Sequence, residues 1–231
     1  MPLRQPIALA AALFAATATA QPSFEGFSDF TEYGLGGLVN SEIIRDLVTA
    51  DFDRDGDLDL AWIRPAAPTF PATDGSVFIR LNPGDGQFDA STEIVINNIG
   101  VRPVALAVGD FDGNGSPDIV VGNNGDGVSS GGLGVLLNNG SGAFTRFGEL
   151  QLAFRIEDVA AGDLDNDGLD EIVFVNSSDP FVDIYEVDAG VNPPLIENVV
   201  LLPGVAGATP SESVAVGYID SDNFLDIAVA D

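Results

Sequence analysis

Short apolar runs recur along the chain and are separated by turns rich in glycine, asparagine and aspartate. In the second of four similar units, a run at Val104–Gly109 leads into an acidic loop, and another at Ile119–Gly122 follows it. A third run at Gly134–Leu137 leads through a second turn to Phe144. Runs of about four to eight β-branched and aromatic residues between turns predict strands rather than helices. The pattern therefore predicts four short strands per unit and an all-β fold.

The unit repeats with a nearly constant period. Its acidic loops begin at Asp51, Asp110, Asp163 and Tyr218. The steps between these positions are 59, 53 and 55 residues. Such a period is typical of a propeller, a solenoid or another array, and four short strands with glycine-rich turns are typical of one propeller blade. The predicted repeats span about 43–99, 100–153, 154–210 and 211–231, the last of them incomplete.

Three of the four loops share one arrangement of oxygen-bearing side chains. They carry aspartate, asparagine or glutamate at positions 1, 3, 5 and 9, with glycine at position 6. Calcium takes about six to eight oxygen ligands in irregular geometry, so such a loop suits it. The residue at position 7 varies, and we expect it to contribute its backbone carbonyl. The predicted calcium ligands are Asp51, Asp53, Asp55, Asp57 and Asp59; Asp110, Asp112, Asn114, Ser116 and Asp118; and Asp163, Asp165, Asp167, Leu169 and Glu171.

The other loop positions predict how the loop folds. Position 2 is apolar in all three loops and is expected to pack into the core beneath: Phe52, Phe111 and Leu164. Glycine at position 6 permits a turn with positive φ that brings the chain back toward the ion.

The fourth loop is a degraded copy of the other three. It keeps Asp220, Asp222 and Asp226 at positions 3, 5 and 9, but Tyr218 replaces the first carboxylate. Asn223 stands at position 6, and asparagine is one of the few residues other than glycine that tolerate left-handed backbone. We expect this loop to keep its fold and to bind calcium weakly or not at all.

Two other calcium-binding motifs begin in a similar way and do not fit. An EF-hand needs a glutamate at position 12 and a helix on each side. Position 12 is here Trp62, Val121 or Phe174, within strand-like runs. The nonapeptide β-roll also fails, because Leu136 stands where its aspartate should follow the glycines at 131–134.

The repeated loops and two further motifs resemble the FG-GAP/VCBS repeat family. The further motifs are the Gly-Asp pairs at Gly109-Asp110 and Gly162-Asp163, and the Asn-x-Gly-x-Gly-x-Phe turns at Asn82–Phe88 and Asn138–Phe144. The resemblance covers roughly residues 43–231. It implies a calcium-binding β-propeller like the head of integrin α subunits. Members of this family act in adhesion, in sugar binding or as accessory domains of enzymes. The turn of the third repeat, at 187–194, departs from the pattern.

The same resemblance implies a ring of about seven blades. The chain carries about three and a half, because Asp231 falls in or just after the second strand of the fourth repeat. We expect a fragment of a longer protein; the alternative is a ring that another subunit completes. Residues 21–42 contain a phenylalanine-rich stretch and are a candidate for a ring-closing outer strand.

The first twenty residues have the pattern of a secretory signal peptide. Arg4 is followed by an apolar stretch at Ile7–Ala16 and by a small-residue cleavage site at 18–20. We therefore predict a secreted, periplasmic or cell-surface protein whose mature chain begins at Gln21. Later segments fall short of the ~20 apolar residues of a membrane span, so we expect no insertion into a membrane.

The charge balance excludes several functions. The chain has 36 acidic and 8 basic residues, and it contains no histidine and no cysteine. A net charge of −28 makes nucleic acid and anionic membranes poor partners. The absence of histidine and cysteine removes the usual general base, the thiol nucleophile and the preferred zinc ligands. We therefore expect no catalytic activity.

Two functional classes remain. One is a secreted, calcium-stabilised scaffold for interaction or adhesion with an unknown protein, which we prefer. The alternative is a carbohydrate-binding propeller, either lectin-like or accessory to a polysaccharide-active enzyme. Aromatic residues in register would favour the second class, but the residues after the second strand of each repeat are Arg64-Pro65, Asn123-Asn124 and Asn176-Ser177. Trp62 follows a buried run and is expected to lie in the core.

Overall fold

The computed structural model describes residues 44–65, 74–84, 86, 88, 93–126, 131–152, 154–176, 182–188, 195–202 and 210–230. All regular structure in these residues is β-strand. They form no helix that could cross a membrane. The all-β prediction is therefore confirmed for the described part of the chain. The predicted signal peptide at 1–20 and the segment 21–42 lie outside it.

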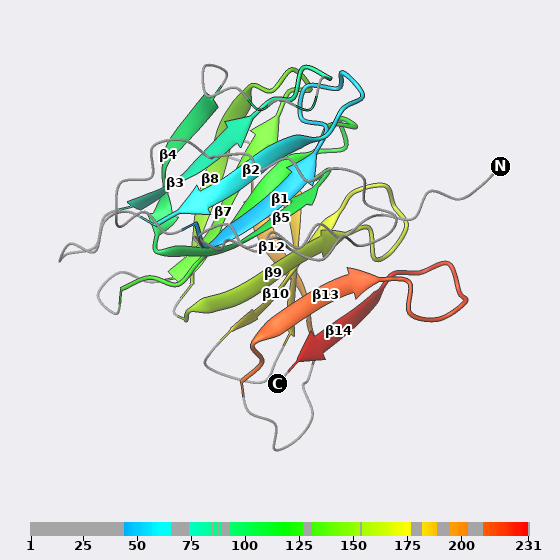
Figure 1. The fold of residues 1–231 in the computed structure, drawn as a ribbon. Coiled ribbons are helices and arrows are strands. Elements are labelled where there is room, and N and C mark those ends of the chain that lie inside the picture. Colours follow the sequence, from blue (N-terminus) through cyan, green and yellow to red (C-terminus); the bar gives the residue numbers. More distant parts are fainter. Residues whose placement is uncertain are drawn as a thin grey trace, which may run out of the picture. The chain divides into compact units, whose positions relative to one another are not determined.

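The strands form three four-stranded antiparallel sheets and one two-stranded sheet (Figure 1). Sheet A contains β1 (Asp46–Ala50), β2 (Asp59–Arg64), β3 (Asp74–Arg80) and β4 (Glu93–Val101). Sheet B contains β5 (Pro103–Gly109), β6 (Asp118–Asn123), β7 (Gly131–Asn138) and β8 (Phe144–Leu152). Sheet C contains β9 (Ile156–Gly162), β10 (Glu171–Asn176), β11 (Val182–Asp188) and β12 (Leu195–Leu202). Sheet D contains β13 (Ser213–Gly217) and β14 (Asp226–Ala230).

Each four-stranded sheet is a meander in which every strand pairs with its neighbour in sequence. The register is regular between the first two strands of sheet A, where Asp46 pairs with Ile63 and Ala50 with Asp59. The outer strand pairs contain β-bulges, for example between Val135 and Leu136 of β7. A series of such meanders is consistent with a β-propeller-like fold.

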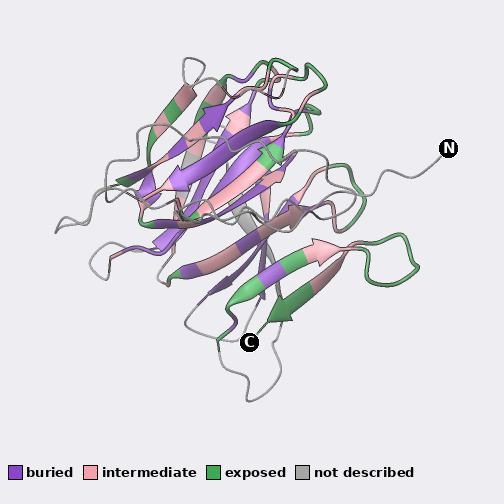
Figure 2. Ribbon diagram, in the orientation of Figure 1, coloured by how far each residue is buried: buried purple, intermediate pink, exposed green. Residues whose placement is uncertain are grey.

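Alternation along each strand decides which neighbouring sheet a side chain contacts. In β6, Ile119 and Val121 join the core between sheets A and B, whereas Val120 joins the core between sheets B and C. Successive side chains of a strand point to opposite faces, so a strand that is covered on both faces needs a continuous apolar run. This explains why the second strands of the first three repeats, β2, β6 and β10, read as uninterrupted runs. Figure 2 shows the resulting burial of these central strands.

Burial decreases in sheet D. Val214 of β13 is 6% exposed and packs with Val173 and Ile184 of sheet C. On β14, Ile227 is partly buried in the same core, whereas Val229 is 41% exposed. Sheet D thus contributes one face to the packing of sheet C, and exposed residues follow one another along β14 (Figure 2).

Aspartates in the first strands fasten two pairs of neighbouring sheets. Asp46 of β1 accepts the backbone N–H of Leu106 in β5 at 2.7 Å. Asp158 of β9 accepts the backbone N–H of Val214 in β13 at 2.9 Å. Ala105 takes the equivalent position in β5, so among the described residues no first-strand aspartate links sheets B and C.

Candidate metal centres

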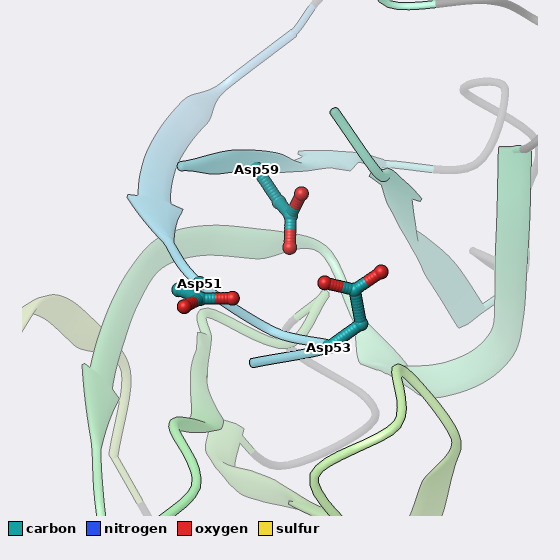
Figure 3. A group of neighbouring side chains, drawn as sticks. All are labelled: Asp51, Asp53 and Asp59. Carbon is teal, nitrogen blue, oxygen red and sulfur yellow. The ribbon is translucent and has the colours of Figure 1, made fainter. Parts of the chain in front are cut away.

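Loop 1 (Asp51–Asp59), loop 2 (Asp110–Asp118) and loop 3 (Asp163–Glu171) connect the first and second strands of sheets A, B and C. Each loop brings three carboxylates together, at positions 1, 3 and 9: Asp51, Asp53 and Asp59; Asp110, Asp112 and Asp118; and Asp163, Asp165 and Glu171. The ligand atoms of a group lie within 4.8 Å of one another. Figure 3 shows the carboxylates of loop 1 turned toward a common space. Oxygens on opposite sides of a calcium ion are ~5 Å apart, so these groups can hold an ion of this size.

The carboxylate at position 9 ties each loop to its own sheet. It accepts the backbone N–H of position 2 through one oxygen, at 2.7 Å for Asp59, 2.9 Å for Asp118 and 2.7 Å for Glu171. The second oxygen of Asp118 accepts the backbone N–H of Asn138 at 2.7 Å. Asp59 makes the same bond with Asn82. All three position 9 side chains are buried, and they form the floor of each site.

Backbone amides hold the carboxylates at positions 1 and 3 in place. In loop 2, Asp110 accepts the N–H of Asn114 at 3.1 Å through one oxygen and that of Gly115 at 2.8 Å through the other. Asp112 also accepts the N–H of Asn114, at 3.1 Å. Loops 1 and 3 repeat these three bonds. The repetition shows that spacing in sequence determines this part of the geometry.

Position 5 makes a local turn in each loop, and its predicted role as a calcium ligand stays a prediction. Asp55 and Asp167 each accept the N–H of position 7 at 2.9 Å, and neither belongs to a three-carboxylate group. Asn114 makes the same turn with Ser116 at 2.8 Å, and its Nδ2 donates to the carbonyl of Asn138. Short polar side chains favour such turns because their own backbone lies within reach. The contribution of the position 7 carbonyls of Asp57, Ser116 and Leu169 stays a prediction.

Each loop contains two left-handed residues, of which the sequence indicated one. The predicted positive φ at position 6 is confirmed, with 99° at Gly56, 77° at Gly115 and 96° at Gly168. Position 4 has positive φ as well, with 61° at Arg54, 70° at Gly113 and 63° at Asn166. Glycine and asparagine favour this region, so Gly113 and Asn166 were compatible with a left-handed residue at position 4. Arg54 at the same position of loop 1 obscured the pattern.

The predicted packing of position 2 is also observed. Phe52 and Phe111 are fully or almost fully buried, at 0% and 1% exposed. Leu164 is partly buried in the core between sheets C and D. Each loop is therefore anchored from below by an apolar side chain and by the carboxylate at position 9.

Burial, and after it the crowding of carboxylates, disfavours ionisation at position 9. Burial raises the pKa of Asp118 to about 7, and the neighbouring Asp112 and Asp110 carboxylates add to the rise, against two backbone hydrogen bonds. Burial likewise raises the pKa of Glu171 to about 7, and the carboxylates of Asp165, Asp163 and Asp167 add to the rise. The pKa of Asp59 is raised for the same reasons. A hard cation among these oxygens would remove this repulsion, so the donor set fits calcium in charge as well as in spacing.

A buried asparagine in sheet B completes loop 1 of sheet A. Asn138 donates from Nδ2 to the carbonyls of Phe52 at 2.8 Å and of Pro117 at 3.0 Å. The N–H of Gly142 donates to the Phe52 carbonyl as well, at 3.0 Å. The ring of Phe144 meets the ring of Phe52 edge-on, with centroids 5.6 Å apart. The Asn-x-Gly-x-Gly-x-Phe turn of sheet B thus covers loop 1 of sheet A, a role that the sequence did not indicate.

Loop 4 (Tyr218–Asp226) shares only part of this geometry. Asp226 accepts the N–H of Ile219 at 2.8 Å, as position 9 does elsewhere. Among the described residues, no three-carboxylate group includes the aspartates of this loop. The expectation of a left-handed Asn223 is wrong, because its φ is not positive. Asp220 still accepts the N–H of Asp222 at 2.8 Å, but Tyr218 offers no carboxylate at position 1 to accept the N–H groups of positions 5 and 6.

Two family models match the chain. One, described as FG-GAP repeat, matches residues 45–79, and the other, described as FG-GAP-like repeat, matches residues 69–121. Together they run from the beginning of sheet A into β6 and include loops 1 and 2. The comparison with curated proteins finds no match.

Proposed function

The chain belongs to the FG-GAP repeat family, and from this we propose that it is a secreted, calcium-binding interaction scaffold in which each four-stranded sheet is one blade of a β-propeller. FG-GAP repeats are the units of integrin-like interaction modules, and the arrangement of meanders agrees with such a module. The observation that carries the proposal is the geometry common to loops 1, 2 and 3, where three carboxylates lie within 4.8 Å of one another.

In this proposal the role of calcium is structural. The residues at positions 1, 3 and 9 would hold the ion, whose charge would offset the burial and the carboxylate repulsion that raise the pKa of Asp118 and Glu171. The loops lie where neighbouring sheets meet, since Asn138 of sheet B bonds to both Phe52 and Pro117. Order in a loop therefore supports the junction between two sheets. Calcium is abundant outside cells, which agrees with the signal-peptide pattern at residues 1–20.

Calorimetric titration of residues 21–231 with calcium tests the proposal. We expect about three weak sites, with dissociation constants of ~10⁻⁴–10⁻³ M as in extracellular modules. Asp112→Asn should remove one site, because it deletes a carboxylate from the group in loop 2 while an amide oxygen can still accept the N–H of Asn114. Glu157→Gln, in β9 outside the loops, is the matched control and should leave three sites. Absence of binding, or a strong preference for magnesium, would contradict the proposal.

One observation favours the alternative of carbohydrate binding. Tyr218 and Phe224 of loop 4 are 67% and 52% exposed, and exposed aromatic rings can stack on sugars. Trp62, in contrast, is fully buried, as predicted, and stacks on Phe78 with ring centroids 5.6 Å apart. If the protein binds polysaccharide, Tyr218→Ala and Phe224→Ala should weaken the binding and leave calcium affinity unchanged. Unchanged polysaccharide affinity in both variants would exclude loop 4 as the sugar site.

A further inference from the structure

Loops 2 and 3 are joined by a reciprocal pair of hydrogen bonds. Asp170, at position 8 of loop 3, accepts the backbone N–H of Asp110 at 2.7 Å through Oδ2. The backbone N–H of Asp170 donates to the carbonyl of Asp110 at 3.1 Å. Asp110 is position 1 of loop 2, so both bonds are made to the residue that begins the candidate metal site of that loop.

The same two loops also contact each other through an apolar side chain. Leu169 lies against Gly113, where a Cβ atom would be only 2.9 Å from Leu169 Cδ2. The Cβ of Asp170 would be equally close to a Cβ at Gly109. Positions 7 and 8 of loop 3 therefore pack against the backbone of Gly109, which precedes loop 2, and of Gly113 within it.

Asp170 connects the two candidate sites: a peptide bond joins it to Glu171 of loop 3, and hydrogen bonds join it to Asp110 of loop 2. It precedes Glu171, which closes the carboxylate group of loop 3 and accepts the N–H of Leu164 at 2.7 Å. On its other side it fixes the backbone of Asp110, whose carboxylate in turn accepts the N–H groups of positions 5 and 6 in loop 2. Its carboxylate belongs to neither group, so it can act as a link without being a ligand.

The other described loop pairs lack this link. Position 8 of loop 2 is Pro117, which has no N–H to donate toward loop 1. Position 8 of loop 4 is Leu225, whose side chain packs at Gly162 but cannot accept a hydrogen bond. Position 8 of loop 1 is Leu58, which is 59% exposed. Leucine is thus compatible with the loop fold at this position, and aspartate is a specific addition in loop 3.

We propose that Asp170 couples the metal sites of loops 2 and 3, so that calcium in one site raises the affinity of the other. The inference rests on the proposed calcium binding. Glu171, held by an ion in loop 3, would fix the backbone at Asp170, and Asp170 would then hold Asp110 in the position suited to the second ion. The order gained at the first site does not have to be gained again at the second, which is the physical basis of positive coupling.

Three equivalent glycines allow each site to be followed separately in the intact chain by ¹⁵N NMR during titration with calcium. Gly56, Gly115 and Gly168 each donate their N–H to the carboxylate at position 1 of their own loop. Their amide signals therefore report on loops 1, 2 and 3. Asp165→Asn weakens the third site, because it removes a charge from its group while an amide oxygen can still accept the N–H of Asp167.

We expect Asp165→Asn to raise the calcium midpoint at Gly115 by at least about fivefold and to leave the midpoint at Gly56 unchanged. In the Asp170→Leu background, which carries the residue found in loops 1 and 4, the same substitution should shift Gly115 by less than twofold. Asp170→Asn keeps an acceptor for the N–H of Asp110 and should preserve the shift.

The coupling would be overturned if Asp165→Asn left the calcium midpoint at Gly115 unchanged. It would also be overturned if Asp165→Asn still shifted this midpoint in the Asp170→Leu background. Loss of the shift in Asp170→Asn as well as in Asp170→Leu would overturn the hydrogen-bonded link. In each of these cases the glycines still respond to calcium, so the proposed function survives. If none of the three glycines responds to calcium, the proposed function fails and the coupling fails with it.

Discussion

Replacing Asn138 by alanine should lower the free energy of unfolding more than replacing an asparagine whose hydrogen bonds stay within one sheet, because Asn138 joins sheets A and B. The side chain is 1% exposed and makes three hydrogen bonds. Nδ2 donates to the carbonyls of Phe52 and Pro117, and Oδ1 accepts the N–H of Gly140 at 3.1 Å. The bond from the backbone N–H of Asn138 to Asp118 would remain.

The cost of Asn138→Ala can be summed from these contacts. Each intramolecular hydrogen bond contributes about 1 kcal/mol net, so three lost bonds amount to about 3 kcal/mol. The carbonyl of Phe52 keeps its bond from Gly142, which limits the penalty for an unpaired buried acceptor there. We therefore expect the free energy of unfolding to fall by about 3 kcal/mol, and the melting temperature by about 6–12 °C for a chain of this size.

Asn82 is a matched control because it begins the same turn motif in sheet A. Its Nδ2 donates to the carbonyl of Leu58 at 3.2 Å, and its Oδ1 accepts the N–H groups of Gly84 and Gly86. All these partners belong to sheet A or its loop, and the side chain is half-exposed, so water can replace the lost bonds. Asn82→Ala should cost only about 1 kcal/mol.

Urea unfolding in saturating calcium gives both values. Trp62 is the single tryptophan and is fully buried in sheet A, so its fluorescence reports unfolding at the sheet whose loop is affected. Circular dichroism should give the same midpoint if the two sheets unfold together. Equal losses in Asn82→Ala and Asn138→Ala would refute the idea that the turn of sheet B locks loop 1. A loss below about 1 kcal/mol in Asn138→Ala would do the same.

Three further predictions concern the ions and the loop backbone. Saturating calcium at ~100 times its dissociation constant should stabilise the fold by ~2.7 kcal/mol per site, so excess chelator should lower the melting temperature; an unchanged melt would mean that the loops do not bind calcium. In the folded state, the pKa values of Asp118 and Glu171 are raised to about 7, compared with ~4 in the unfolded chain, so the folded protein binds these protons more tightly. In chelator, the resulting stabilisation should be complete below pH ~4 and should be lost as the pH rises toward 7. A melting temperature in chelator that rises between about pH 4 and 7 would contradict this prediction. Asp118→Asn should make the melting temperature depend less steeply on pH. Gly168→Val should lower the free energy of unfolding by about 1–2 kcal/mol through the φ of 96° alone, because no atom lies within 4 Å of the added Cβ. Gly217→Ala is the control: it also has open space but no positive φ, so it should leave the melting temperature almost unchanged.

The loops were predictable because their geometry is local. The bonds from positions 5 and 6 back to positions 1 and 3 span at most five residues, so spacing in sequence is enough to predict them. The strand pattern was predictable for the same reason, since burial on both faces of β6 requires the continuous run at 119–121. Arg54 shows the limit of residue preference, because its left-handed backbone is imposed by the loop on a residue that does not favour it.

The contacts between sheets could not be predicted in this way. The bond from Asn138 to Phe52 joins residues 86 positions apart, and the bond from Asp110 to Asp170 joins residues 60 apart. Both depend on how one sheet is stacked on the next, which no spacing within a repeat expresses. The sequence indicates that this asparagine belongs to a turn, and only the packed structure shows which loop it covers.

The covering of loop 1 by the turn of sheet B determines where this chain can be recombined. A chimera joined between β4 and β5 would separate the carbonyl of Phe52 from both of its donors, Asn138 and Gly142. A crossover placed after Phe144 would transfer the loop together with its cover. The exchangeable module is therefore offset from the sheet by the first three strands of the next meander, and shuffling experiments should place their joints in the outer strand β8.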